Sequence, residues 1–78
     1  MTNSPHDTIL IRARVNPREI CYLTDILEGY PGYVVMRTEN VKKGLIQFWI
    51  APDFYDDVIE ILDDLKEEIN LVFLENGS

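Results

Sequence analysis

The sequence contains one cysteine and one histidine, and this scarcity limits the chemistry that it can support. A lone Cys21 excludes an intramolecular disulfide and a multi-cysteine zinc site, and its place in an apolar helical pattern predicts a buried, unreactive thiol. His6 falls in a polar segment that we expect to be mobile. No nucleophile, base and orienting group can be assembled from these two residues and scattered carboxylates, so we expect no enzyme, no metal site and no cofactor.

Long apolar runs and positive charge are also scarce. No stretch of about 18 apolar residues is present, and the start "MTNSPHD" lacks the apolar segment of a signal peptide. We therefore expect a cytoplasmic protein that does not bind membranes. Seven Lys and Arg stand against 14 Asp and Glu, for a net charge of −7. An evenly spread charge of this sign disfavours nucleic acid as a partner, because phosphate binding depends on Lys and Arg.

What remains is the composition of an ordinary globular domain, with 46% apolar and 27% charged residues in a chain of 78. We expect one domain over residues 7–75, a flexible N-terminal segment over 1–6 and a flexible tail over 76–78. A chain of this size builds only a modest core, so burial against a partner would stabilise it.

The first half of the chain predicts a strand and a helix. Apolar residues alternate over 7–15, which indicates a strand. Asn16 and Pro17 favour a helix start, because the asparagine side chain can accept from a free backbone N–H and proline needs no N–H there. The helix is expected over 17–28, with Gly29 ending it in the left-handed conformation.

The second half predicts a hairpin, a helix and a short strand. "YPGY" fits a type II turn with Gly32 at the position of positive φ. "YVVMRTE" and "LIQFWIA" are predicted to pair as a hairpin around "NVKKG". Pro52 begins a helix over 52–69, where acidic residues in the first turns match the helix dipole. "LVFLE" is the expected last strand.

This order predicts an α+β domain with the ferredoxin-like βαββαβ plan, a two-layer sandwich. The antiparallel sheet would have the order 4-1-3-2, with both helices on one face. Strand alternation assigns the helix-covered side to Ile9, Ile11, Ala13, Val34, Met36, Ile46, Phe48 and Ile50. The uncovered side would carry Leu10, Arg12, Arg14, Tyr33, Val35, Arg37, Leu45, Gln47 and Trp49, with either Phe73 or the pair Val72 and Leu74. Such a mixed surface indicates a self-association or binding face.

Charge is divided between the two layers. The net charge is −2 over 17–29, −7 over 52–69 and +2 over the rest of the chain. We interpret the acidic second helix as a solvated face, and Asp53, Asp56 and Asp57 as a response to the helix dipole rather than a cation site. Lys42 and Lys43 are interpreted as a solvated turn. The sheet is therefore the mildly basic layer.

A second candidate site lies at one end of the predicted sheet. Topology brings Tyr30, Tyr33, Asp53 and Phe54 together there. These residues could line a pocket for a small molecule, because aromatic walls with a few polar groups are typical of such sites. They could equally close the end of the core.

The stretch "ILEGYPGYVVMRTENVKKGLIQFWIAPDFYDDVIEILDDL", with the short "NP" and "AP" connections, resembles a family of short, uncharacterised bacterial single-domain proteins related in fold to ACT-type regulatory domains. The resemblance implies an ACT-like fold, a regulatory role and a homo-oligomer, most simply a dimer formed through sheet edges or faces. It also implies an amino-acid site near the first strand-to-helix turn. In this chain Asn16-Pro17 stands where a glycine-containing ligand loop is expected.

Two functions remain open. One is a self-associating ACT-like module that senses a small ligand or has a structural role. The other is single-stranded RNA binding through the uncovered sheet face, as in RRM-type domains, with aromatic stacking and arginines on phosphate. The residue types suited to RNA are those of Trp49, Tyr33, Arg12, Arg14 and Gln47, but the "[KR]-G-[FY]" signature is absent.

Overall fold

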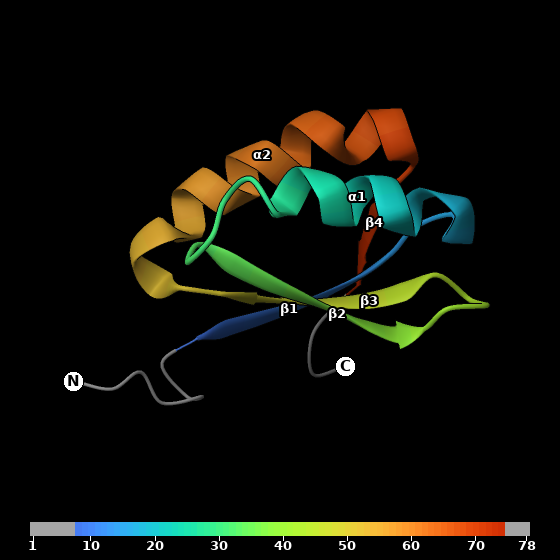
Figure 1. The fold of residues 1–78 in the computed structure, drawn as a ribbon, viewed down its shortest axis with the longest axis horizontal. Helices are drawn as coiled ribbons and strands as arrows, with labels where there is room; N and C mark the ends of the chain where they lie inside the picture. The colour runs from blue at the N-terminus through green and yellow to red at the C-terminus, as the bar shows by residue number, and fades with distance from the viewer. Residues whose placement is uncertain (1–7, 75–78) are drawn as a thin grey trace.

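The computed structural model describes residues 8–74 as one layer of sheet and one layer of helices. Both helices lie on the same face of the sheet, and the opposite face is uncovered by any described element (Figure 1). The elements in chain order are β1 (Ile9–Arg14), the 3-10 turn η2 (Pro17–Glu19), α1 (Ile20–Leu27), β2 (Val34–Asn40), β3 (Leu45–Ile50), the 3-10 turn η3 (Pro52–Phe54), α2 (Tyr55–Ile69) and β4 (Val72–Leu74). The expectations for 1–6, 76–78 and His6 concern residues outside this range.

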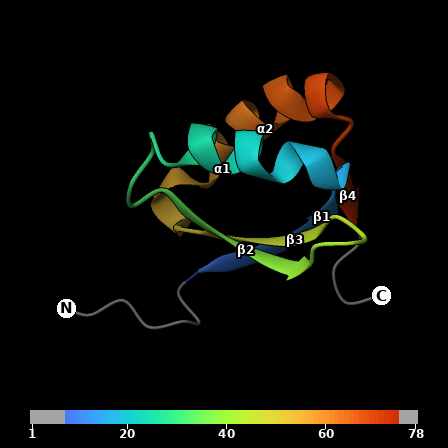
Figure 2. The same ribbon diagram turned by 45° about the vertical axis from the view of Figure 1, so that its right-hand side comes forward.

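The sheet has four antiparallel strands in the order β2-β3-β1-β4 (Figure 2). Read from the β4 edge, the order is β4-β1-β3-β2. The predicted α+β class and the placement of both helices on one face are confirmed, and the arrangement is compatible with the ferredoxin-like plan. β3 and β1 are the two central strands, so the helix-facing residues of these strands lie in the middle of the layer interface.

The core lies between the sheet and the helices. It is formed by the buried residues Ala13, Val15, Leu23, Leu27, Ile46, Phe48, Ile50, Val58, Leu62, Leu65, Ile69 and Leu71. In β3 every second residue is buried, as the period of a strand requires. Ile11, Val34 and Met36 pack against this core and are partly buried. Ile9, expected on the covered side, is 36% exposed at the first position of β1.

Both helices begin with a proline in a 3-10 turn. Asn16 Oδ1 accepts from the backbone N–H of Arg18 at 3.1 Å, which is the predicted cap. The second helix begins in the same way at Pro52, but without a side-chain cap. α2 ends at Asn70, whose left-handed φ of 56° allows the backbone N–H of Leu71 to reach the carbonyl of Lys66.

The predicted end of α1 at a left-handed Gly29 is wrong. Positive φ among the described glycines occurs at Gly32 and Gly44 only. Instead, the chain leaves α1 through successive tight turns, in which Gly29 N donates to Ile26 O and Tyr30 N donates to Leu27 O. These turns satisfy the last carbonyls of the helix without a residue of positive φ.

The two predicted glycine turns are present. Tyr33 N donates to Tyr30 O at 3.1 Å, and Gly32 between them has a φ of 86°, as a type II turn requires. In the β2–β3 hairpin, Lys43 N donates to Asn40 Oδ1, and Gly44 has a φ of 69°. These turns set where β2 begins and where β3 begins.

Cys21 and Tyr22 are exposed on the outer side of α1. Cys21 is exposed, so its predicted burial is wrong; the buried residues of α1 are Leu23 and Leu27, which leave Cys21 facing solvent. Next to it, Tyr22 Oη donates to Glu68 Oε2 at 2.9 Å and joins α1 to α2. This hydrogen bond and the negative charge of Glu68 raise the pKa of Tyr22.

Neither α1 nor α2 has the length and apolar character needed to cross a bilayer, and this holds for every helix within residues 8–74.

Candidate functional site

The sheet face opposite the helices, here called the open face, carries an apolar row at one end. Leu10 of β1, Trp49 of β3 and Val35 of β2 stand directly opposite one another on three adjacent strands. Val35 is 57% exposed, whereas Leu10 and Trp49 are partly buried. Side chains at directly opposite positions contact one another, so the row forms one continuous apolar strip.

Two further rows cross the open face. The middle row contains Arg37, Gln47, Arg12 and Leu74, and the last row contains Leu45, Arg14 and Val72. The register of β4 resolves the alternative that the sequence left open. Phe73 pairs with Ala13 and packs against the core, so Val72 and Leu74 lie on the open face. Of the nine residues predicted on the uncovered side, all except Tyr33 lie in these three rows.

An ion pair on the open face was not predicted. Arg12 binds both carboxylate oxygens of Glu39, with Nη2 at 2.9 Å from Oε1 and 3.1 Å from Oε2. Glu39 lies where β2 shifts register between Thr38 and Asn40, and its side chain reaches across β3 to β1. Strand alternation places Glu39 on the same side of the sheet as Val35, so the sequence pattern could have put Glu39 on the open face. One of the three predicted cations is thus paired, because a bidentate carboxylate neutralises the guanidinium.

Arg14 and Arg37 differ from Arg12. Both are exposed, and neither forms an ion pair with any residue of 8–74. The positive charge available on the open face therefore lies at two separate places, one on β1 and one on β2.

Trp49 is held in place by its neighbour along β3. The indole Nε1 donates to Gln47 Oε1 at 3.1 Å, and both side chains are partly buried. A hydrogen bond between positions i and i+2 of a strand keeps the indole along the strand, on the open face. Trp49 is therefore an ordered surface residue and does not belong to the core.

A depression of about 430 Å³ opens beside the indole. It is lined by Thr8, Val35, Arg37, Gln47 and Trp49. Its volume lies within the range of small-molecule sites. Thr8, just before β1, was absent from the predicted face, although strand alternation places it on the same side as Leu10.

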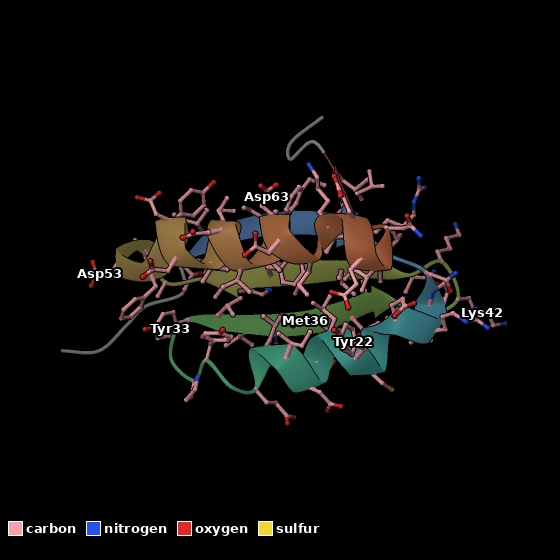
Figure 3. All side chains as sticks on the ribbon, turned by 90° about the horizontal axis from the view of Figure 1, so that it is seen from above. Tyr22, Tyr33, Met36, Lys42, Asp53 and Asp63 are labelled. Atoms are coloured by element: carbon pink, nitrogen blue, oxygen red, sulfur yellow. The ribbon has the colours of Figure 1, made fainter. Side chains whose placement is uncertain are left out.

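At the second predicted site, three aromatic rings pack against one another. Tyr33 stacks on Phe54 with ring centroids 4.0 Å apart, and Tyr30 meets Tyr33 edge to face at 5.8 Å. Tyr33 was also expected on the open face, and this is wrong, since it packs against the core just before β2 begins. Figure 3 shows Tyr33 and the exposed Asp53 at the same end of the molecule. These ring contacts favour the alternative that the residues close the end of the core.

The side chains of α2 are mostly acidic, whereas the hairpin turn carries Lys42 and Lys43. Asp63 on α2 and Lys42 on the hairpin lie far apart in the helix-side view (Figure 3). Asp63 contacts Lys66 at 3.6 Å, an exposed pair of small energetic weight. No group of three or more His, Cys, Asp or Glu within 8–74 is arranged to hold a metal ion.

Comparison with known proteins gives one result. No curated protein and no solved structure matches the chain. A family model, described as a domain of unknown function (DUF4911), matches residues 13–69, from within β1 to the end of α2. This span includes α1, the hairpin and most of the open face. Because the match covers well over half of the chain, the protein belongs to the DUF4911 family.

Proposed function

We propose that this domain is a non-catalytic, ACT-like module that self-associates through the open face, with a second copy as its partner. The observation that supports this most directly is the row of Leu10, Trp49 and Val35, which are adjacent on three strands of the uncovered face. The free energy gained by removing such a strip from water is about 25 cal/mol per Å². A dimer with two-fold symmetry is the simplest arrangement.

The rest of the open face suits burial. The Arg12–Glu39 pair neutralises the centre of the face, and Leu45, Leu74 and Val72 continue its apolar area on the other side. A paired charge costs less to remove from water than an isolated one. In a two-fold dimer the same residues contribute from both copies, so each apolar contact occurs twice.

Replacing Trp49 by alanine is expected to lower the mass in solution from that of a dimer to that of a monomer. Truncation of an aromatic hot-spot residue costs about 2 kcal/mol or more, which corresponds to roughly a thirtyfold change in the dissociation constant. Light scattering at micromolar concentration measures the mass, and circular dichroism checks that the fold is retained. The matched control is Tyr22→Ala, which removes an exposed aromatic from the helical layer and should leave the mass unchanged.

The parent protein supplies the more direct test. Trp49 is the only tryptophan, so its emission reports this face alone. Between two copies the indole is shielded from water, and its emission should shift to the blue as concentration rises. A monomeric mass at high micromolar concentration contradicts the proposal.

Single-stranded RNA binding is the second candidate. Trp49 beside Arg37, which forms no ion pair within 8–74, favours it, because stacking and phosphate contacts combine in this way on other sheets. Against it, Tyr33 is withdrawn from the face and Arg12 is neutralised.

Titration with a short single-stranded oligoribonucleotide separates the two functions. If the open face is a self-association surface, we expect no quenching of Trp49 at low salt. RNA binding predicts quenching that weakens steeply with added salt, since bound phosphates release counterions. A salt-sensitive quench would therefore favour RNA over a second copy.

A further inference from the structure

The depression beside Trp49 combines hydrogen-bond donors with apolar walls. Its five lining residues come from β2, from β3 and from the residue before β1. Arg37 and Gln47 stand directly opposite each other on neighbouring strands. One position further along, Val35 and Trp49 are also directly opposite. A polar pair and an apolar pair therefore lie side by side within one hollow.

The orientation of the Gln47 amide is determined by Trp49. An indole nitrogen can only donate a hydrogen bond, so the amide oxygen of Gln47 must face it, at 3.1 Å. The amide nitrogen then points away from the indole. It forms no hydrogen bond to another residue of 8–74, and both of its N–H groups remain available to a ligand.

Arg37 adds a positive charge to these donors. Its guanidinium has no ion-pair partner within 8–74, because the nearest acid on β2, Glu39, is bound by Arg12. A guanidinium beside a neighbouring amide donor can bind a carboxylate or phosphate through charge-assisted hydrogen bonds. A cation would be repelled from this hollow, and a purely apolar ligand would leave its donors unpaired.

We propose that the depression binds a small aromatic anion, in which an aromatic ring packs on Trp49 and Val35 while a carboxylate or phosphate group accepts from Arg37 and Gln47. This site goes beyond the proposed self-association and does not depend on it, because all five lining residues belong to one copy. A second copy on the open face would contact the same indole, so the anion and the second copy compete.

Two pairs of probes test the site by the fluorescence of Trp49. Phenylacetate carries a carboxylate and adenosine 5′-monophosphate carries a phosphate; phenylacetamide and adenosine are their uncharged counterparts. Adenosine also controls for light absorbed by the nucleotide. The titrations use the lowest protein concentration that fluorescence allows, so that any dimer has dissociated. We expect a saturable change with one or both anions, and the responding anion identifies the preferred group.

Three variants distinguish a specific anion-binding site from general attraction to positive charge. Arg37→Gln should lower the affinity for the responding anion about tenfold or more, the usual effect of losing a charged hydrogen bond. Arg14→Gln is the matched control, since Arg14 is an exposed arginine of the same face that has no ion-pair partner in the described part of the chain and does not line the depression. It should change affinity less than about threefold, as expected of a charge screened by solvent. Gln47→Glu keeps an acceptor for Trp49 but replaces the donors by a negative charge, and should abolish binding.

The outcomes are distinct. Equal responses to anions and uncharged counterparts, equal losses in Arg37→Gln and Arg14→Gln, or no response to either anion at millimolar concentration would each overturn the site. The mass in solution is measured independently. A monomer that binds the anion refutes the proposed dimer and supports the site, whereas a dimer whose dissociated form shows no response does the reverse.

Discussion

Replacing Phe48 by alanine is expected to lower the free energy of unfolding by about 3–5 kcal/mol, as for other buried phenylalanines. Phe48 is fully buried at the centre of β3, between Ile11 of β1 and Met36 of β2. The loss combines apolar surface no longer buried with a cavity that the neighbouring strands cannot fill. Urea titration followed by circular dichroism measures it, and a domain this small would lose a large part of its stability.

Asp64→Asn provides the comparison. Asp64 is exposed on α2 and forms no ion pair with another residue of 8–74, so its neutralisation should change stability by less than about 0.5 kcal/mol. If Phe48→Ala unfolds at the same urea concentration as the parent, the assignment of the covered and open faces is wrong.

The second large effect is expected for Gly44→Ala. A Cβ at this position would overlap the carbonyl oxygen of Val15 and lie 2.9 Å from its carbonyl carbon. The backbone there has a φ of 69°, and Val15 N donates to Gly44 O at 2.9 Å. The substitution therefore adds a left-handed alanine and forces the hairpin away from β1, which breaks that hydrogen bond. We expect a loss of more than about 3 kcal/mol, measured by urea titration.

Gly32→Ala isolates the contribution of the clash. Gly32 also has a positive φ, 86°, but a Cβ there would meet no atom within 4 Å. The free energy of unfolding of Gly32→Ala should fall only by the cost of a left-handed alanine, about 1–2 kcal/mol. If both variants lose the same amount, the close approach of Gly44 to Val15 does not constrain the fold.

Local patterns predicted the elements of this fold because each depends on neighbours in the sequence. Alternation in 45–50 predicted which side of β3 is buried, and Pro17 and Pro52 marked both helix starts. The errors occurred where local rules had alternatives. Gly29 could end a helix with or without positive φ, and Cys21 could follow the apolar stripe of α1 or lie beside it.

The candidate site was predicted only in part. Parity alone was sufficient to place Trp49, Arg37 and Gln47 on one side of the sheet. It did not show that Gln47 turns its amide oxygen to Trp49, or that no acid among the described residues pairs with Arg37. Both follow from side-chain contacts between positions whose distance depends on strand register.

The sequence by itself determined the elements, their order, the covered side of the sheet and the separation of acidic helices from a mildly basic sheet. These properties follow from local periodicity, proline and glycine geometry and a count of charges. Only the tertiary structure decided that Glu39 neutralises Arg12 across β3, that Tyr33 stacks on Phe54, and that a depression opens beside Trp49. Each of these joins residues from different elements, and such contacts exist only after the strands have paired in one register.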